Sequence, residues 1–192
     1  AVSSEILRNF TNVTRLPGIT VANYWVDTAE VHGLKRVVSV SENFKREEES
    51  LVTANTILKN SLGTGYLEIF NRRTSLKERI RLLADAMEEA TGMQDMGAYL
   101  TTLFEIDALF LNQDRHLNNI ALIRDRAGYK PCPIFDCGDS FLLDFALYSP
   151  EIESRAYLTK AQCLPFKSRF TQTVHTAQTL YGKQLVVNID KT

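Results

Sequence analysis

At 192 residues, with 44% hydrophobic and 23% charged side chains, the chain has the composition of an ordinary globular protein, which excludes wholesale disorder. The formal net charge of -1 excludes a strongly basic surface for direct binding of nucleic acid. Three cysteines outside any C-x-x-C spacing, no apolar run of about 18 residues and no leader pattern in residues 1–20 predict a cytoplasmic protein with reduced thiols and no membrane span.

The chain is expected to begin with a helix and to continue into a β-hairpin. Apolar residues recur there at helical spacing: Val2, Ile6, Leu7 and Phe10. Pro17-Gly18 ends this pattern. Residues 20–26 and 35–40, rich in Val, Tyr, Trp and Thr, then predict two short strands joined through His32-Gly33.

Two further helices are predicted in the next part of the chain. The acidic run Glu47-Glu48-Glu49 suits the first turn of a helix that continues through residues 51–58. Residues 61–65 contain two glycines and predict a loop, although their G-x-G lacks the third glycine of a phosphate-binding loop. Ser75-Leu76-Lys77-Glu78 forms a capping box, and the helix with one apolar face that follows is predicted to end at Gly92.

The middle of the chain combines a buried helix with a polar loop. Residues 97–111 are apolar on most sides, which predicts a helix at the centre of the molecule. This helix leads into the polar cluster 112–116, and charged groups next to a core need partners or a task. Two strands follow at 120–124 and 129–135, and prolines confine the second to a sheet edge. This hairpin should bring the residues before and after it together.

The last part of the chain contains one clear element. After Pro150, an amphipathic helix is predicted from four residues aligned on one face: Phe170, Val174, Ala177 and Leu180. Residues 184–189 then alternate between polar and apolar, as a short strand would.

Three oxygen-bearing side chains flank the hairpin at 120–135: Asp114, Asn119 and Asp136. Transfer of the terminal phosphoryl group of ATP needs a divalent metal to neutralise phosphate charge, and a carboxylate to orient the attacking hydroxyl and accept its proton. Magnesium prefers oxygen ligands and keeps several waters, so one Asp and one Asn suffice. The set therefore fits magnesium-dependent phosphotransfer from ATP.

The motifs around these side chains resemble those of known kinases. Asp114-Arg115-His116-Leu117-Asn118-Asn119 followed by Ile134-Phe135-Asp136-Cys137-Gly138 resembles the D-x-H-x-x-N and D-x-G pair of HipA-like kinases and of phosphoinositide kinases. The HipA-like group is favoured because Ser41-Glu42-Asn43-Phe44 and Cys163-Leu164-Pro165-Phe166 also look like its members.

The resemblance implies a fold of the α+β class, mainly α: the C-terminal lobe of a protein-kinase-like fold with short β-hairpins. Residues 1–192 would form this single lobe, with an opening helix and hinge hairpin in 1–45 and a helical lobe with the catalytic hairpin in 46–192. A kinase also needs earlier strands that carry a phosphate-covering loop and a Lys. We therefore expect an N-terminal lobe that is largely missing, truncated or on a separate chain, and weak binding of ATP by this chain alone.

The resemblance also implies roles for the motif residues. Asp114 matches the catalytic base, and Asn119 and Asp136 match the metal ligands. Cys137 stands in place of Phe in the D-F-G-like position, and Gly138 would permit the turn.

Further residues receive roles in the same way. His116 would support the catalytic loop by hydrogen bonding, and Arg115 would pair with a carboxylate or a phosphate. Glu5 lies where kinases place the Glu that pairs with an ATP-contacting Lys. The hinge, whose backbone meets adenine, would include Ser39, Val40 and Ser41.

The function implied is phosphorylation of a Ser or Thr hydroxyl on a protein substrate, with ATP and Mg²⁺. Many HipA-like kinases are toxins held by a DNA-binding antitoxin, which makes an antitoxin a possible partner. Alternatives are a phosphoinositide-type lipid kinase, a catalytically inactive kinase-like binding module, and a phosphohydrolase with a metal on His116, Asp114 and Asp139. Asp114 and Asn119 are also common helix-end and turn residues, which is the structural alternative.

Overall fold

The computed structural model describes residues 1–13, 18–72, 75–142, 144, 146–149, 151–158 and 160–187. The helices are α1 (Val2–Phe10), α2 (Ala54–Leu62), α3 (Tyr66–Arg72), α4 (Leu76–Thr91), α5 (Met96–Phe110), α6 (Ser154–Leu158) and α7 (Phe170–Tyr181). The strands are β1 (Thr11–Val13), β2 (Tyr24–Val31), β3 (Leu34–Ser41), β4 (Ser50–Thr53), β5 (Ala121–Asp125), β6 (Gly128–Pro131), β7 (Gln162–Cys163), β8 (Ser168–Arg169) and β9 (Leu185–Val187). Within these residues no helix is long and apolar enough to cross a membrane.

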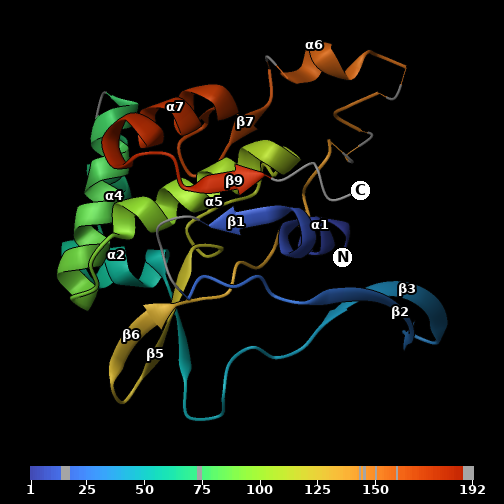
Figure 1. Cartoon of the computed structure of the whole chain (residues 1–192), viewed down its shortest axis with the longest axis horizontal. Coiled ribbons are helices and arrows are strands. Elements are labelled where there is room, and N and C mark those ends of the chain that lie inside the picture. Colours follow the sequence, from blue (N-terminus) through green and yellow to red (C-terminus); the bar gives the residue numbers. More distant parts are fainter. Residues whose placement is uncertain are drawn as a thin grey trace.

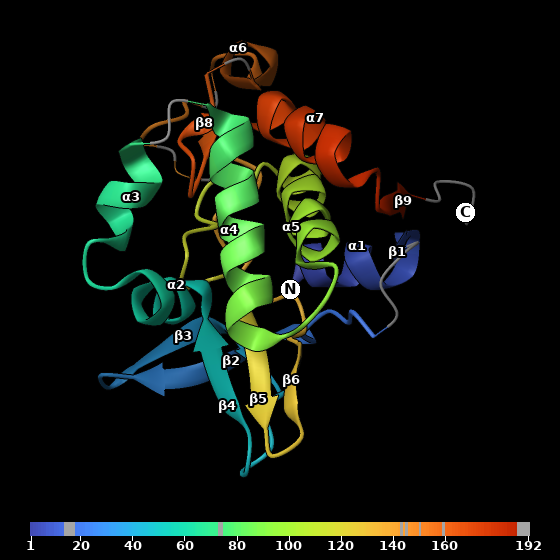
Figure 2. The same cartoon turned by 90° about the vertical axis from the view of Figure 1, so that its left-hand side faces the viewer.

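The central element is α5, which confirms the prediction from its apolar sequence. Nearly all of its residues are buried. It packs against both α4 and α7, and Figure 2 shows the three helices side by side. The approach to α7 is close: a Cβ built on Gly97 would lie 2.3 Å from the ring of Tyr181. Only a glycine fits there without a movement of that ring.

The predicted capping box begins α4. The backbone N–H of Glu78 donates to Ser75 Oγ at 3.1 Å, and the Ser75 N–H donates back to the Glu78 carboxylate at 3.3 Å. At the other end, Gly92 adopts the left-handed conformation and its N–H donates to the Glu88 carbonyl at 2.8 Å. Both ends of this helix therefore lie where the sequence predicts them.

A three-stranded antiparallel sheet, ordered β4-β5-β6, lies beside the helices. β6 lies at the edge, as the prolines predict, but it ends at Pro131 and not at the predicted residue 135. The predicted helix start at Glu47-Glu48-Glu49 is wrong, because Ser50–Thr53 form β4 and the helix begins only at Ala54. The carboxylate of Glu49 accepts a hydrogen bond from Lys130 on β6. The last acidic residue of the run thus holds a sheet together instead of starting a helix.

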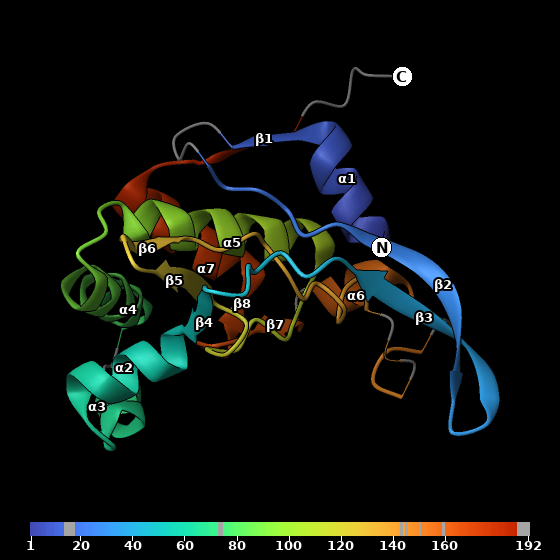
Figure 3. The same cartoon turned by 90° about the horizontal axis from the view of Figure 1, so that it is seen from below.

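The predicted N-terminal hairpin is also present, but its first strand spans Tyr24–Val31 and not the predicted residues 20–26. β2 and β3 pair from Tyr24↔Ser41 to Val31↔Leu34 and turn at His32-Gly33. Figures 1 and 3 show this hairpin reaching away from the helices. Most of its side chains are exposed.

A second small sheet joins the two ends of the described chain. β1 pairs antiparallel with β9, and β1 follows α1 directly, so the opening helix ends before Pro17. The buried carboxylate of Glu105 on α5 accepts the backbone N–H groups of Gln184 and Leu185, at 3.2 and 2.6 Å. Pro17, Pro150 and the predicted tail residues 188 and 189 lie outside the described residues.

Candidate functional site

A buried ion pair organises the loop that follows α5. Asp107, in the last turn of α5, and Arg115 are almost wholly buried. Arg115 Nη2 lies 2.9 Å from Asp107 Oδ1, and Arg115 Nε donates to Oδ2 at 3.0 Å. The Asn112 amide donates to the same carboxylate at 2.7 Å. Burial disfavours the charged guanidinium, but the carboxylate of Asp107 outweighs it and holds the pKa of Arg115 above its ordinary value.

Arg115 also joins the two segments that carry the motif. Beyond Asp107, its guanidinium donates to three acceptors: the backbone oxygens of Asn119 (3.0 Å) and Phe135 (2.8 Å), and the sulfur of Cys137 (3.3 Å). The Gln113 N–H donates to the Asp139 carbonyl at 3.1 Å. Residues 113–119 and 135–139 therefore lie against each other, although a β-hairpin separates them in the sequence.

The loop 114–119 is a tight, internally bonded turn. The N–H of His116 donates to the Asp114 carbonyl at 2.8 Å, and the N–H of Asn119 donates to the His116 carbonyl at 2.8 Å. Asn119 Nδ2 donates to the same Asp114 carbonyl at 3.0 Å. The nitrogen of the Asn119 amide is thus occupied, which leaves the amide oxygen as the atom able to ligate a metal.

The side chains of Asp114 and His116 are partly exposed beside this turn. His116 Nε2 lies 3.7 Å from Asp114 Oδ2. The other ring nitrogen of His116, Nδ1, is buried and has no hydrogen-bond partner in the described part of the chain. The carboxylate of Asp114 is therefore open to solvent, and one edge of the imidazole faces it.

Asp136 lies on the other segment in the left-handed backbone conformation. Its φ is 53°, in the left-handed region that disfavours side chains other than those of Asn and Asp. Its N–H donates to the Tyr24 hydroxyl at 3.4 Å. The expected turn at Gly138 thus has its left-handed residue at Asp136. A Cβ on Gly138 would make only an ordinary contact, 3.6 Å from Asp136 Oδ1.

The site carries concentrated negative charge. Burial, followed by the charges of Asp114 and Asp144, raises the pKa of the Asp139 carboxyl above its ordinary value. The interaction with Asp114 shows that these carboxylates, from the two joined segments, repel each other. A cation placed between the segments would relieve this repulsion.

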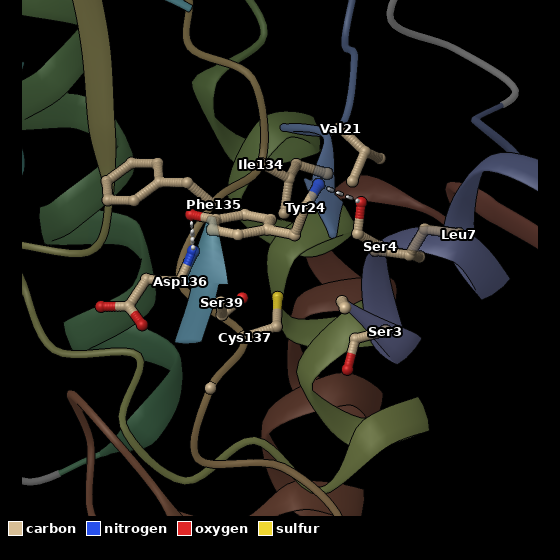
Figure 4. Close-up of a pocket in the computed structure, with 12 residues that line it drawn as sticks. Ser3, Ser4, Leu7, Val21, Tyr24, Ser39, Ile134, Phe135, Asp136 and Cys137 are labelled. Carbon is tan, nitrogen blue, oxygen red and sulfur yellow. Dashed lines mark hydrogen bonds between the residues drawn. The ribbon is translucent and has the colours of Figure 1, made fainter. Parts of the chain in front are cut away.

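A cavity of about 180 Å³ borders Asp136. Its walls come from the start of α1, from β2 and β3, and from residues 134–138. Figure 4 shows Asp136 at one side of it, with Cys137 and Ser39 below and Ser4 and Tyr24 above. The Ser4 hydroxyl donates to the Ala22 carbonyl at 2.7 Å, which anchors α1 to this wall.

Some of the residues predicted to contact the nucleotide line this cavity, and others do not. Ser39 lines it, whereas Val40 and Ser41 on β3 are not among its lining residues. Glu5 lies exposed on α1, also outside the lining. Asp114, Arg115, His116 and Asn119 belong to the neighbouring turn. The structure thus brings Ser39 to the same cavity as Asp136 and leaves Glu5, Val40 and Ser41 outside it.

Sequence reasoning missed two residues of this site. Asp107 holds Arg115 and through it both motif segments, and Tyr24 accepts the N–H of Asp136. A signal for Asp107 was present, since a carboxylate inside the apolar run 97–111 needs a buried partner. No local signal marked Tyr24, whose contact spans more than half of the chain.

The phosphohydrolase alternative needs a metal site built from at least three His, Cys, Asp or Glu side chains. In the described ranges no group of three or more His, Cys, Asp or Glu side chains is placed to hold a metal ion. The phosphohydrolase alternative, which needs His116, Asp114 and Asp139 around one metal, is therefore not assembled.

The arrangement of a helical body, a small antiparallel hairpin and a bonded pair of acidic motif segments is that of a kinase-like fold. Among solved structures, the chain is similar to the crystal structure of a Helicobacter pylori proinflammatory kinase, CtkA, with a TM-score of 0.54 and 20% sequence identity. The match covers 83% of this chain and 47% of that chain, so this chain spans about half the length of that kinase. No protein-family model matches the chain, and no curated protein matches it.

Proposed function

We propose that this chain is the catalytic lobe of an ATP- and Mg²⁺-dependent kinase of the HipA-like type, which phosphorylates a Ser or Thr hydroxyl of a protein. One observation carries the proposal: the guanidinium of Arg115 binds both motif segments at once, through the backbone oxygens of Asn119 and Phe135. A phosphotransfer site needs its base and its metal ligands on one rigid frame. Three side chains separated by a hairpin could not act together without such a connection.

The residues present fit a magnesium ion. The candidate ligands are the amide oxygen of Asn119 and the carboxylate of Asp136, both hard oxygen donors. Bound Mg²⁺ would supply neutralisation of the phosphate charge. The pKa of Asp139 is raised first by burial and then by the charges of Asp114 and Asp144, and a cation near these carboxylates would reduce the second effect.

Asp114 is proposed as the base that receives the acceptor. Its carboxylate is partly exposed, so a substrate hydroxyl can approach it. In the transfer, the hydroxyl oxygen bonds to the terminal phosphorus of ATP as the bond from that phosphorus to ADP breaks, and the hydroxyl proton passes to Asp114. His116, 3.7 Å from that carboxylate, would orient it.

The nucleotide is proposed to occupy the cavity between α1, β3 and residues 134–138. Ser39 and Asp136 both line it, so a base held at the hinge would place its phosphates toward Asp136. Its volume of about 180 Å³ is smaller than a whole nucleotide site, which is typically about 300 Å³ or more. We therefore expect only part of the nucleotide to be enclosed and the affinity of this chain alone to be weak.

The test is calorimetric titration with a non-hydrolysable ATP analogue, with and without Mg²⁺. We expect weak binding that depends on Mg²⁺, and a loss of about tenfold or more in the Asp136→Ala variant, the size of one charge-assisted ligand contact. Asp85→Ala, which removes an exposed carboxylate from α4, is the matched control and should bind as the unaltered chain does.

Two outcomes would reject the kinase. Binding of the ATP analogue that depends neither on Mg²⁺ nor on Asp136 would favour a catalytically inactive, kinase-like binding module. Hydrolysis of a simple phosphate ester without ATP would favour a hydrolase. Transfer to a phosphoinositide rather than to a protein would keep the chemistry and change the acceptor.

A further inference from the structure

A second and larger cavity, of about 540 Å³, borders the loop 114–119, which we call the catalytic turn. It lies between α2, α3, the start of α4 and the segment 164–167. Its lining includes His116, Leu117 and Asn118, and His116 lies two residues after Asp114 in the chain. Asp136 and the first cavity share no lining residue with it. We call it the acceptor groove, defined by its lining residues Asn55, Tyr66, Leu67, Phe70, Asn71, Arg79, His116, Leu117, Asn118, Leu164, Pro165, Phe166 and Lys167.

The acceptor groove has a distinct charge. Its lining holds two cationic side chains, Arg79 and Lys167, and no carboxylate among the described residues. Three amide side chains add further donors and acceptors: Asn55, Asn71 and Asn118. In a chain whose net charge is -1, a groove without acidic residues attracts an anionic ligand.

Arg79 is only partly used by the protein. Its Nη1 donates to the Phe166 carbonyl at 2.9 Å, and its guanidinium carbon lies 5.7 Å from the centre of the Phe166 ring. These contacts hold the side chain in place at the wall. Its Nε is buried without a hydrogen-bond partner in the described part of the chain. A buried charged donor without a partner is costly, so the hydrogen-bonding capacity of this guanidinium is not filled by the described protein atoms.

The wall that carries Lys167 is rigid and connected to the catalytic turn. The N–H of Leu164 donates to the carbonyl of Gln113, the residue before Asp114, at 3.1 Å. Phe166 is 2% exposed and its ring packs on those of Phe70 and Phe104. The position of Lys167 relative to Asp114 is therefore set by the core.

We propose that the acceptor groove binds an acidic peptide segment of the protein substrate, with substrate carboxylates at Arg79 and Lys167 and the acceptor hydroxyl at Asp114. This inference rests on the proposed function and names the substrate class for the same site. The amides provide partners for a peptide backbone, and Leu67, Leu164 and Pro165 provide apolar contacts for its side chains.

A phosphoinositide headgroup fits the groove less well. Such a headgroup carries several phosphates, each of about -1.5 to -2 charges, against two cations in the described lining. One or two substrate carboxylates match that charge. The groove also has a mixed polar and apolar wall, whereas a polyphosphate site needs clustered basic side chains.

The test measures binding of a fluorescent peptide that has one serine with glutamates on both sides, by anisotropy and without ATP or Mg²⁺. The full chain should bind it, and a twin peptide with lysines in place of the glutamates should not bind. Lys167→Gln, an exposed position where folding is not at risk, should weaken binding about tenfold, the size of one charge-assisted contact. Arg79→Gln should weaken it as much or more.

Arg72→Gln is the matched control. Arg72 is exposed on α3, next to Asn71, and pairs with Glu68 rather than lining the groove, so its loss should leave peptide binding unchanged. Because the assay contains no nucleotide, its result is independent of the calorimetric test of ATP binding.

Equal binding of the two peptides, or equal effects of Lys167→Gln and Arg72→Gln, would overturn the proposal. So would binding of the chain to vesicles containing phosphoinositides together with no binding of the acidic peptide.

Discussion

Arg115 joins the two segments of this site, but its burial costs free energy of hydration. A buried ion pair loses the hydration of both charges, and its mutual attraction offsets that loss only when every donor and acceptor is used. Here the guanidinium has Asp107 on one side and two backbone carbonyls and a sulfur on the other. The contacts that compensate for the burial of Arg115 are the same contacts that bring residues 119 and 135 together.

Removal of the Asp107 charge should therefore loosen both segments. In Asp107→Asn the guanidinium stays buried without its counter-charge, which typically costs about 3–5 kcal/mol. We expect the urea midpoint to fall accordingly, and amide exchange of His116 and Asn119 to accelerate more than that of the α4 amides. A double variant, Asp107→Leu with Arg115→Met, should recover stability but lose the side-chain bonds that join Asn119 to Phe135 and Cys137.

A loss of less than about 1 kcal/mol in Asp107→Asn would mean that the backbone carbonyls alone hold Arg115. Fast exchange in the single variant with unchanged stability would contradict the idea that one bond network carries both properties.

At the scale of elements, the sequence predicts what is decided locally. The Ser75 box, the apolar run of α5 and the hairpin turn at His32-Gly33 each act through neighbours within a few residues. The helix start predicted at Glu47–Glu49 is wrong because a distant contact acts on this run. The carboxylate of Glu49 binds Lys130, on a strand far along the chain. β1 is only three residues long and pairs with the distant β9, so no local pattern in the sequence predicts it.

The same division holds at the candidate site. The hairpin between Asp114–Asn119 and Asp136 predicted that their segments meet, as they do through Arg115, whereas the chemistry assigned to the three side chains stays a prediction. The connection itself, from Asp107 through Arg115, could not be read from spacing because it depends on how α5 ends against the turn. The acceptor groove is likewise built from α2, α3, α4 and residues 164–167, which no motif links.

The close contact of α5 with α7 gives a prediction at this scale. Gly97→Ala would put a methyl group 2.3 Å from the Tyr181 ring, so the ring or the helix must move, and overpacking of this kind costs about 1–3 kcal/mol. We expect a lower thermal midpoint. Gly65→Ala is the control, since a Cβ there has no neighbour within 4 Å, and it should unfold as the unaltered chain does. Equal midpoints for the two variants would show that α7 adjusts freely.

At the scale of the whole molecule, carboxylates with a lowered pKa and those with a raised pKa change the stability of the fold in opposite directions as the pH falls. The hydrogen bond from Lys130 lowers the pKa of Glu49 from its ordinary value of 4.5, and the Ala127 N–H is the main cause of a lowered pKa at Asp125. Groups of this kind stabilise the fold above their ordinary pKa and lose that contribution as the pH falls through the folded pKa. Asp139, whose pKa is raised, has the opposite sign.

Acid should therefore destabilise the sheet that Glu49 and Lys130 hold. Stability should decline as the pH falls below about 4.5, and Glu49→Gln should be less stable at neutral pH and lose less on acidification. Urea unfolding across this range, with Glu47→Gln as the exposed control from the same acidic run, checks it. Parallel pH curves for the chain and for Glu49→Gln would refute this assignment.

The sheet of β1 and β9 has a consequence for synthesis. β1 is synthesised long before its partner β9, which stands near the end of the described residues. Until then one edge of β1 is open, and an open edge is a template for another chain. A nascent polypeptide stalled before residue 185 would carry that edge, and the Glu105 carboxylate on α5 would lack the N–H group of Leu185. Such stalled chains should accordingly aggregate more readily than chains that include β9.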